Sequence, residues 1–250
     1  MNTCPAELNF ASHLAALNAA RAAKPAYIDD SRQLSYGELA ERVARMAGAL
    51  RQLGLRREER ILLLMQDTVD WPVAFLGALH AGVVPVAVNT LLTPDDYAYI
   101  ITHSRVRAVF VSDALMPALQ AALAQSPGDV EHVVVSQPNN AQPNIAQPHT
   151  AQRNTAPLSN AQPVPAPVQD FNTLLAAAPL APAVRTLSDE IAFWLYSSGS
   201  TGKPKGVVHT HGNLWHTAEL YAKPVLGIRE DDVVFSAAKL FFAYGLGNGL

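Results

Sequence analysis

Residues 197–206 combine glycine, hydroxyl and lysine side chains in a way that suits phosphate chemistry. They read Ser-Ser-Gly-Ser-Thr-Gly-Lys-Pro-Lys-Gly and follow an apolar run. Glycines let backbone N–H groups approach phosphate oxygens, hydroxyls donate hydrogen bonds to the same oxygens, and lysines neutralise their charge. The segment therefore favours a polyphosphate-binding loop over a flexible surface turn, because a surface turn has no need of two lysines around a proline.

The spacing within this loop differs from that of a Walker A motif. Only two residues separate Gly199 from Gly202, and Pro204 follows Lys203 where a Walker A loop has serine or threonine. No hydroxyl is thus placed on Mg²⁺ at the start of a tight helix. The difference disfavours a kinase or P-loop nucleoside triphosphatase and favours a loop that can bind ATP and later release pyrophosphate.

A second segment, residues 239–249, places aromatic side chains beside closely spaced glycines. It reads Lys-Leu-Phe-Phe-Ala-Tyr-Gly-Leu-Gly-Asn-Gly. Such a segment can form a flat apolar slot for a planar aromatic ring whose carboxylate faces outward. Composition leaves a core-packing turn open as the alternative. A dinucleotide-binding loop is disfavoured, because the glycine spacing is wrong and no helical pattern follows the segment.

No metal site is predicted. His209 and His211 are two residues apart and would share one face of a strand, which could place two ligands together. A zinc site usually recruits three or four ligands, and no cysteine or acidic cluster accompanies these histidines. Cys4, the one cysteine, lies in an N-terminus that we expect to be frayed, so no nucleophilic role is assigned to it.

Apolar strands that alternate with amphipathic helices must position these segments. A fold of class α/β follows, with a mostly parallel sheet covered by helices on both faces. The pattern predicts strands at 61–65, 83–88, 106–111, 133–136, 191–196 and 233–236, and helices at 36–53, 69–81, 115–124 and 170–178, with further helices opening at Thr93 and near Asn213.

Capping signals support three of the helix starts. Ser35 and Glu38 form a capping box, and Thr93 precedes a proline and two acids at the next helix start. Asp67 is expected to cap the helix that begins near Val69.

Residues 137 to about 169 differ in composition from the rest of the chain. The tripeptide Ala-Gln-Pro recurs at 141–143, 146–148 and 161–163, and Arg153 is the one charged residue. The segment lacks the apolar surface that would offset the entropy of ordering it. It is therefore predicted to be a disordered, Gln/Pro-rich insertion, which a surface loop tolerates well.

The overall composition of the chain disfavours nucleic-acid-binding and membrane-spanning classes of protein. The chain has 250 residues, 49% of them hydrophobic and 16% charged, with a net charge of −3. No basic field is available for nucleic acid or an anionic membrane, and no apolar run is long enough to cross a bilayer. No signal peptide is visible at the N-terminus, and the expected location is the cytoplasm.

The stretch from Tyr196 through Gly206 to Leu214 resembles the signature phosphate loop of the adenylate-forming superfamily, the AMP-binding acyl-CoA synthetases and their relatives. Residues 77–86 and 89–96 are similar to motifs ahead of that loop. Residues 239–248 resemble the acid-binding motif in the form found in benzoate–CoA ligases. The resemblance covers nearly the whole chain outside the Gln/Pro-rich insertion.

The resemblance implies an acid–thiol ligase that uses ATP, Mg²⁺ and coenzyme A to activate benzoate or a related aromatic carboxylate. It implies that the ATP phosphates contact Ser197, Ser198, Gly199, Ser200, Thr201, Gly202, Lys203 and Lys205. Among these, Lys203 and Thr201 are the expected catalytic residues. It implies an aromatic-acid pocket at Ala243, Tyr244 and Gly245.

The resemblance also implies parts that lie beyond residue 250. Members of the superfamily carry further residues for Mg²⁺ and ribose, and a small C-terminal domain with a catalytic lysine. Residues 1–250 are therefore expected to be part of the large AMP-binding domain and to be inactive alone. A ligase for another aromatic or short-chain acid and a non-catalytic nucleotide-binding remnant stay open. A homodimer of the full-length protein is compatible with the resemblance.

Overall fold

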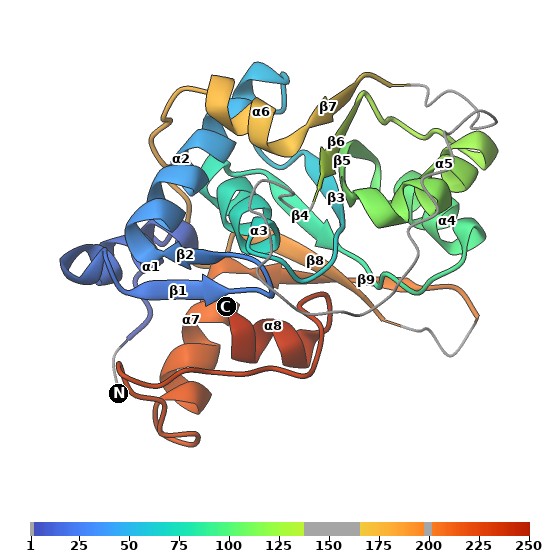
Figure 1. The fold of residues 1–250 in the computed structure, drawn as a ribbon. Coiled ribbons are helices and arrows are strands. Elements are labelled where there is room, and N and C mark those ends of the chain that lie inside the picture. Colours follow the sequence, from blue (N-terminus) through green and yellow to red (C-terminus); the bar gives the residue numbers. More distant parts are fainter. Residues whose placement is uncertain (1–2, 138–165, 198–201) are drawn as a thin grey trace, which may run out of the picture.

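A seven-stranded sheet is the centre of the computed structural model, which describes residues 3–137, 166–197 and 202–250 (Figure 1). The strand order is β7-β6-β5-β3-β4-β8-β9, and every pairing is parallel except that of β8 with β9. This confirms the predicted α/β class. The strands are β3 (Arg60–Leu64), β4 (Val84–Ala87), β5 (Val106–Ser112), β6 (His132–Ser136), β7 (Val168–Asp170), β8 (Ile191–Ser197) and β9 (Lys205–Thr210).

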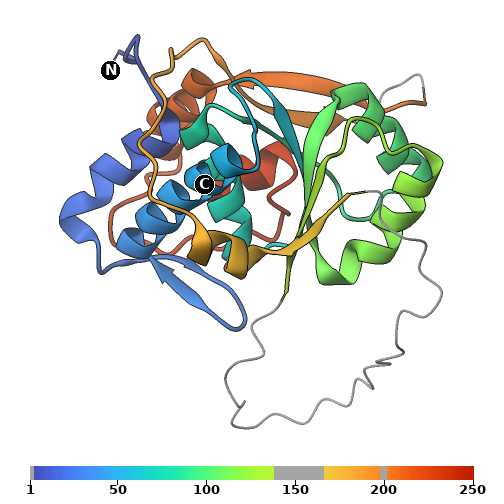
Figure 2. The same cartoon turned by 90° about the horizontal axis from the view of Figure 1, so that it is seen from above.

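Helices cover both faces of this sheet, as Figure 2 shows from above. Alternate residues of β3 belong to different cores: Ile61 and Leu63 to one, Leu62 and Leu64 to the other. This alternation is why a strand buried on both faces is apolar throughout. The first core lies under α1 (Phe10–Asn18), α2 (Tyr36–Gln52), α3 (Asp70–Ala81) and α6 (Phe171–Ala177), and the second under α4 (Pro94–Ser104) and α5 (Met116–Gln125).

Smaller elements lie beside the sheet. An antiparallel hairpin of β1 (Pro25–Ile28) and β2 (Gln33–Ser35) leads into α2. Two helices follow β9, and Figure 1 shows both below β8 and β9: α7 (His211–Thr217) and α8 (Ala243–Gly249). Short helical turns occupy Ala19–Arg21, Asp113–Leu115 and Ala218–Ala222.

Two of the three predicted helix caps are confirmed. Ser35 and Thr93 each accept a hydrogen bond from the backbone N–H three residues on, and each closes a capping box. The third prediction is wrong, because α3 follows Val69 without a side-chain cap. Asp67 instead accepts a hydrogen bond from the backbone N–H of Leu240, far along the chain.

The predicted strand at 233–236 is also wrong. These residues take part in no strand pairing, and Phe235 is 90% exposed. A β-branched run supplies propensity, but a strand also needs a neighbour to bond with, and none of the described strands lies alongside.

The end of the Gln/Pro-rich insertion lies earlier than predicted. Residues 168–170 form β7, which pairs in parallel with β6. The predicted disorder of the repeats concerns residues 138–165, which lie outside the described ranges.

The N-terminal segment is tied to the fold by its described residues, against the expectation of a frayed end. Glu7 forms a β-bridge with Leu187, and the Leu8 N–H donates to the carbonyl of Thr186. Within the described residues, no helix combines the length and the apolar character that a membrane crossing requires.

Candidate functional site

A cleft of about 640 Å³ opens at the carboxyl ends of β4 and β8. Ligands of open parallel sheets bind at this edge of the strands, because the loops that follow the strands converge there. The cleft brings together three parts of the chain: the segment after β4, the β8–β9 pair, and residues 241–243.

The β8–β9 pair forms one wall of the cleft. Its register places Leu195 opposite Val207 and Ser197 opposite Lys205. Because side chains alternate along a strand, residues at this two-residue spacing share one face. Leu195, Ser197, Val207 and His209 accordingly all line the cleft.

The two ends of the predicted phosphate loop border the cleft. Ser197, Gly202 and Pro204 line it, and Gly202 has a left-handed backbone with φ of 88°. Lys203 and Lys205 are exposed, with the Lys203 Nζ 5.1 Å from the centre of the Tyr99 ring on α4. The tip of the loop, with the predicted residues Ser198, Gly199, Ser200 and Thr201, lies outside the described ranges.

The predicted acid-binding segment forms another wall, with a shifted set of residues. Ala243 lines the cleft together with Phe241 and Phe242, whereas Tyr244 and Gly245 do not. Tyr244, at the start of α8, is 69% exposed. Gly245 serves packing, because a Cβ atom there would lie 2.1 Å from the carbonyl oxygen of Lys239.

The glycine-rich segment is itself helical, because residues 243–249 form α8. The sequence left a flat slot and a core-packing turn open for this segment and predicted no helix for it. Glycines are poor helix formers, so tight packing against residues 239–240, not propensity, accounts for this helix.

The segment after β4 closes the cleft with Asn89, Leu92 and Asp96. Asp96 accepts hydrogen bonds from the N–H and the hydroxyl of Thr93, so its carboxylate already serves the start of α4. Tyr196 also lines the cleft, and its hydroxyl lies 2.6 Å from Nδ1 of His103. Burial is the main cause that raises the pKa of Tyr196 to about 12, so this phenol stays protonated at neutral pH.

His209 lines the cleft, although the sequence analysis did not assign it to the site. Its ring stacks on Phe193 with 4.7 Å between centres and 4° between planes, and burial lowers its pKa. Counting alternate positions forward from Lys205 would have placed His209 on the same face of β9 as Val207.

His211 does not share a face with His209. It begins α7, is buried, and accepts a hydrogen bond from the Phe10 N–H at Nδ1. The described residues contain no group of three or more histidine, cysteine or acidic side chains placed to bind a metal.

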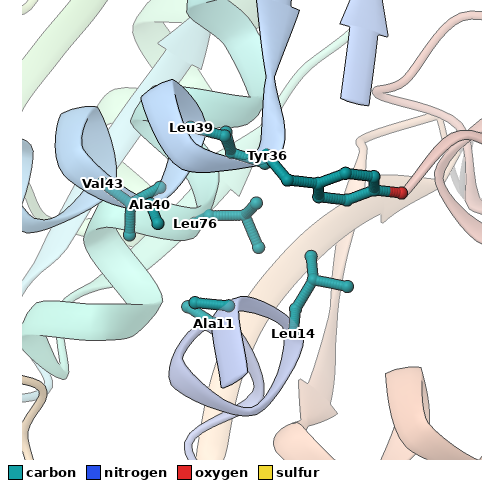
Figure 3. A pocket seen from close by; sticks show the side chains of 8 residues that line it. Ala11, Leu14, Tyr36, Leu39, Ala40, Val43 and Leu76 are labelled. Atoms are coloured by element: carbon teal, nitrogen blue, oxygen red, sulfur yellow. The ribbon is translucent and has the colours of Figure 1, made fainter. Parts of the chain in front are cut away.

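A second hollow lies between α1, α2 and α3, lined by apolar side chains and Tyr36 (Figure 3). Its volume is about 10 Å³. That space suits at most one water molecule, so this hollow cannot accept an organic substrate.

Comparison with known proteins shows the family to which this chain belongs. The model of the family described as AMP-binding enzyme matches residues 14–250. The chain belongs to the AMP-binding enzyme family. This confirms the resemblance seen in the phosphate loop and in the segment at 239–248.

Similar AMP-binding enzymes include ligases for aromatic acids. The benzoate–CoA ligase of Thauera aromatica is 47% identical over 98% of this chain and 42% of its own length. The 4-hydroxybenzoate–CoA/benzoate–CoA ligase of Rhodopseudomonas palustris is 45% identical over 92% of this chain and 38% of its own length. The chain therefore spans about two fifths of the length of these relatives.

Solved AMP-binding structures share the fold. A benzoate CoA ligase from Burkholderia xenovorans LB400 matches with a TM-score of 0.79 and 52% identity, over 96% of this chain and 42% of that one. The anthranilate CoA ligase AuaEII, solved with anthranoyl-AMP, matches with a TM-score of 0.82 and 30% identity, over 98% of this chain and 43% of that one.

Proposed function

We propose that the protein containing this chain is an aromatic acid–CoA ligase that activates benzoate or a close relative with ATP. One observation carries the proposal: a single cleft is bordered by both ends of the phosphate loop and by Phe241, Phe242 and Ala243. Two substrates that must react with each other need adjoining sites of this kind. The similarity to benzoate–CoA ligases supports the choice of acid.

The chemistry consists of two displacements. A carboxylate oxygen attacks the α-phosphorus of ATP, which forms acyl-AMP and releases pyrophosphate. The thiolate of coenzyme A then attacks the acyl carbon, which forms the thioester and releases AMP. Each step moves negative charge, so a site with fixed donors and cations lowers the barrier.

The residues proposed for the phosphates are Ser197, Gly202, Lys203 and Lys205, together with the loop tip at 198–201. Lys203 and Lys205 would neutralise the phosphate oxygens, and Ser197 would donate a hydrogen bond. Thr201 is proposed beside Lys203 in catalysis, as a donor to the departing pyrophosphate. The exposure of both lysines at the mouth of the cleft supports this assignment.

The acid would lie against Phe241, Phe242 and Ala243, with His209 on the facing wall. Tyr244 and Gly245 stay in the proposal as neighbours of this wall: Tyr244 at its outer edge, and Gly245 as the packing contact beneath it. A flat ring gains from contact with aromatic faces, which suits benzoate better than a flexible chain.

The described residues do not form an Mg²⁺ site by themselves. Asp96 is the only described acid that lines the cleft, and its carboxylate caps α4. Mg²⁺ usually enters such sites on the nucleotide phosphates with one or two protein carboxylates. No step is therefore assigned to the metal through these residues.

The test is acid-dependent release of pyrophosphate from ATP by the complete protein that contains this chain. Benzoate should give the highest kcat/KM among benzoate, 2-aminobenzoate, the hydroxybenzoates and hexadecanoate. Lys203→Ala and Lys205→Ala should each lower kcat/KM by about tenfold or more, since each removes a charged phosphate contact. Lys223→Ala, which changes an exposed lysine outside the loop and the cleft lining, should not.

A protein that releases no pyrophosphate with any aromatic acid would overturn the proposal. A preference for a hydroxybenzoate would instead identify a sister ligase, the candidate that the Rhodopseudomonas palustris relative favours. A cytoplasmic location, a homodimer and the inactivity of residues 1–250 alone stay predictions, open to fractionation, size-exclusion chromatography and the same assay.

A further inference from the structure

Asp67 joins two segments that are distant in sequence. It lies in the loop between β3 and α3, and its Oδ1 accepts a hydrogen bond from the Leu240 N–H at 3.3 Å. Its Oδ2 lies 3.7 Å from Nζ of Lys239. The carboxylate therefore contacts the two residues that directly precede the acid-binding wall at 241–243.

The backbone at 239–240 in turn supports the start of α8. The Phe242 N–H donates to the Lys239 carbonyl at 3.0 Å, and the Leu246 N–H donates to the Phe242 carbonyl at 2.8 Å. Gly245 packs so closely that a Cβ atom there would overlap the Lys239 carbonyl. A shift of Lys239 and Leu240 would therefore move Phe242 and Ala243 as well.

The residues that precede Lys239 offer little support to the acid-binding wall. Residues 229–238 form no described strand or helix, and Val233 and Phe235 are exposed. Leu240 and Phe241 pack on the core. Apolar contact fixes how deeply these side chains are buried, but it does not fix the orientation of the backbone, because it is non-directional. A hydrogen bond is directional, so Asp67 supplies what apolar contact cannot.

Asp67 is a partly buried carboxylate whose partners are the Leu240 N–H and the Lys239 ammonium. Burial raises its pKa, and the Leu240 N–H and the Lys239 ammonium lower it by smaller amounts. Burial of a carboxylate is unfavourable unless its partners offset the cost.

We propose that Asp67 is a positioning residue for the acid substrate: it fixes Lys239 and Leu240 and thereby sets the wall formed by Phe241, Phe242 and Ala243. This rests on the proposed function, in which that wall binds the acid. Asp67 contacts no substrate and takes no part in the nucleotide site.

Kinetics of the complete protein test the proposal. Asp67→Ala should raise the KM for benzoate about tenfold, the size expected from losing one charge-assisted hydrogen bond, with the KM for ATP changed by less than about twofold. Asp67→Asn keeps an oxygen acceptor for Leu240 and should restore the KM to within about twofold.

Asp113→Ala, an exposed acid at the start of the helical turn Asp113–Leu115, is the control and should leave both KM values unchanged. Equal rises in the KM for ATP and for benzoate in Asp67→Ala would overturn the proposal, as would no change in either. A KM for benzoate that stays high in Asp67→Asn would also overturn it, because the acceptor would then not be the acting feature.

Amide hydrogen exchange separates this proposal from the proposed function. Asp67→Ala should speed exchange at residues 240–243, and Asp67→Asn should not, whether or not benzoate is a substrate. If the wild-type protein activates no aromatic acid, the proposed function fails, while exchange still decides whether Asp67 fixes this wall. Unchanged exchange at residues 240–243 in Asp67→Ala would by itself contradict the positioning role.

Discussion

His211 begins α7 with only 1% of its surface exposed, and its Nδ1 accepts the Phe10 N–H at 3.2 Å. Burial is the main cause that lowers its pKa from 6.5 to about 4; Glu190 acts against burial and Arg57 acts with it. The folded protein therefore keeps this ring neutral at a pH where an unfolded chain would protonate it. His211 therefore serves as a structural hydrogen-bond acceptor rather than as a metal ligand or a base.

The sign of the pH effect follows from proton counting. Between pH 6.5 and about 4 the unfolded chain binds more protons at His211 than the folded chain does, so stability falls as the pH falls through this window. The full loss is about 3 kcal/mol. His211→Asn, which retains an acceptor near Nδ1 but does not titrate, should flatten the fall in a series of urea denaturations.

The matched control for this prediction is His216→Asn, an exposed position on the same helix. It should leave the dependence of the unfolding free energy on pH as it is in the wild type. An unchanged slope in His211→Asn would mean that other groups govern acid sensitivity.

Helix α2 shows what local sequence decides at the scale of an element. Its capping box joins Ser35 and Glu38 through the Glu38 N–H to Oγ at 3.3 Å and the Ser35 N–H to Oε2 at 2.8 Å. All these groups lie within four residues, so the sequence displays the whole interaction. The prediction that Asp67 caps α3 is wrong, because Asp67 instead bonds to Leu240, a residue that is remote in sequence.

Removing the cap of α2 should weaken the fold by a modest amount. Ser35→Ala leaves the Glu38 N–H without its acceptor and should lower the unfolding free energy of the chain by about 1 kcal/mol. Ser35→Asp, another good cap, should stay close to the wild type. Chemical denaturation followed by circular dichroism measures both, and equal midpoints for alanine and aspartate would contradict the role.

At the scale of the whole molecule, Asp70 ties together elements that the sequence keeps far apart. This fully buried carboxylate accepts hydrogen bonds from Arg32 at 3.0 Å, Arg42 at 3.1 Å and Ser136 at 2.8 Å. Its partners lie in the β1–β2 turn, in α2 and at the end of β6. A buried charge of this kind is tolerated only because it is paired several times over.

Breaking this network should cost far more than breaking a surface pair. Asp70→Asn leaves two guanidinium groups without their charge partner and should lower the unfolding free energy by about 3 kcal/mol or more. Glu41→Gln removes the same charge from an exposed pair with Arg45 and should cost less than about 0.5 kcal/mol. Similar losses in the two variants would show that burial does not govern this interaction.

Local patterns in the sequence were enough for the alternation of strands and helices and for two capping boxes. Apolar runs such as 61–65 need two covered faces wherever they lie. The family resemblance also followed from sequence alone, since it depends on motifs that are continuous along the chain.

Only the tertiary structure decided which residues share the cleft. Ala243 lines it while Tyr244 and Gly245 do not, because helix α8 rotates successive side chains by about 100°. Strand register places His209 on the face of β9 that lines the cleft, and Asp67 bonds to Leu240, which lies 173 residues further along the chain. These contacts depend on the meeting of segments that are distant in sequence, which no local pattern encodes.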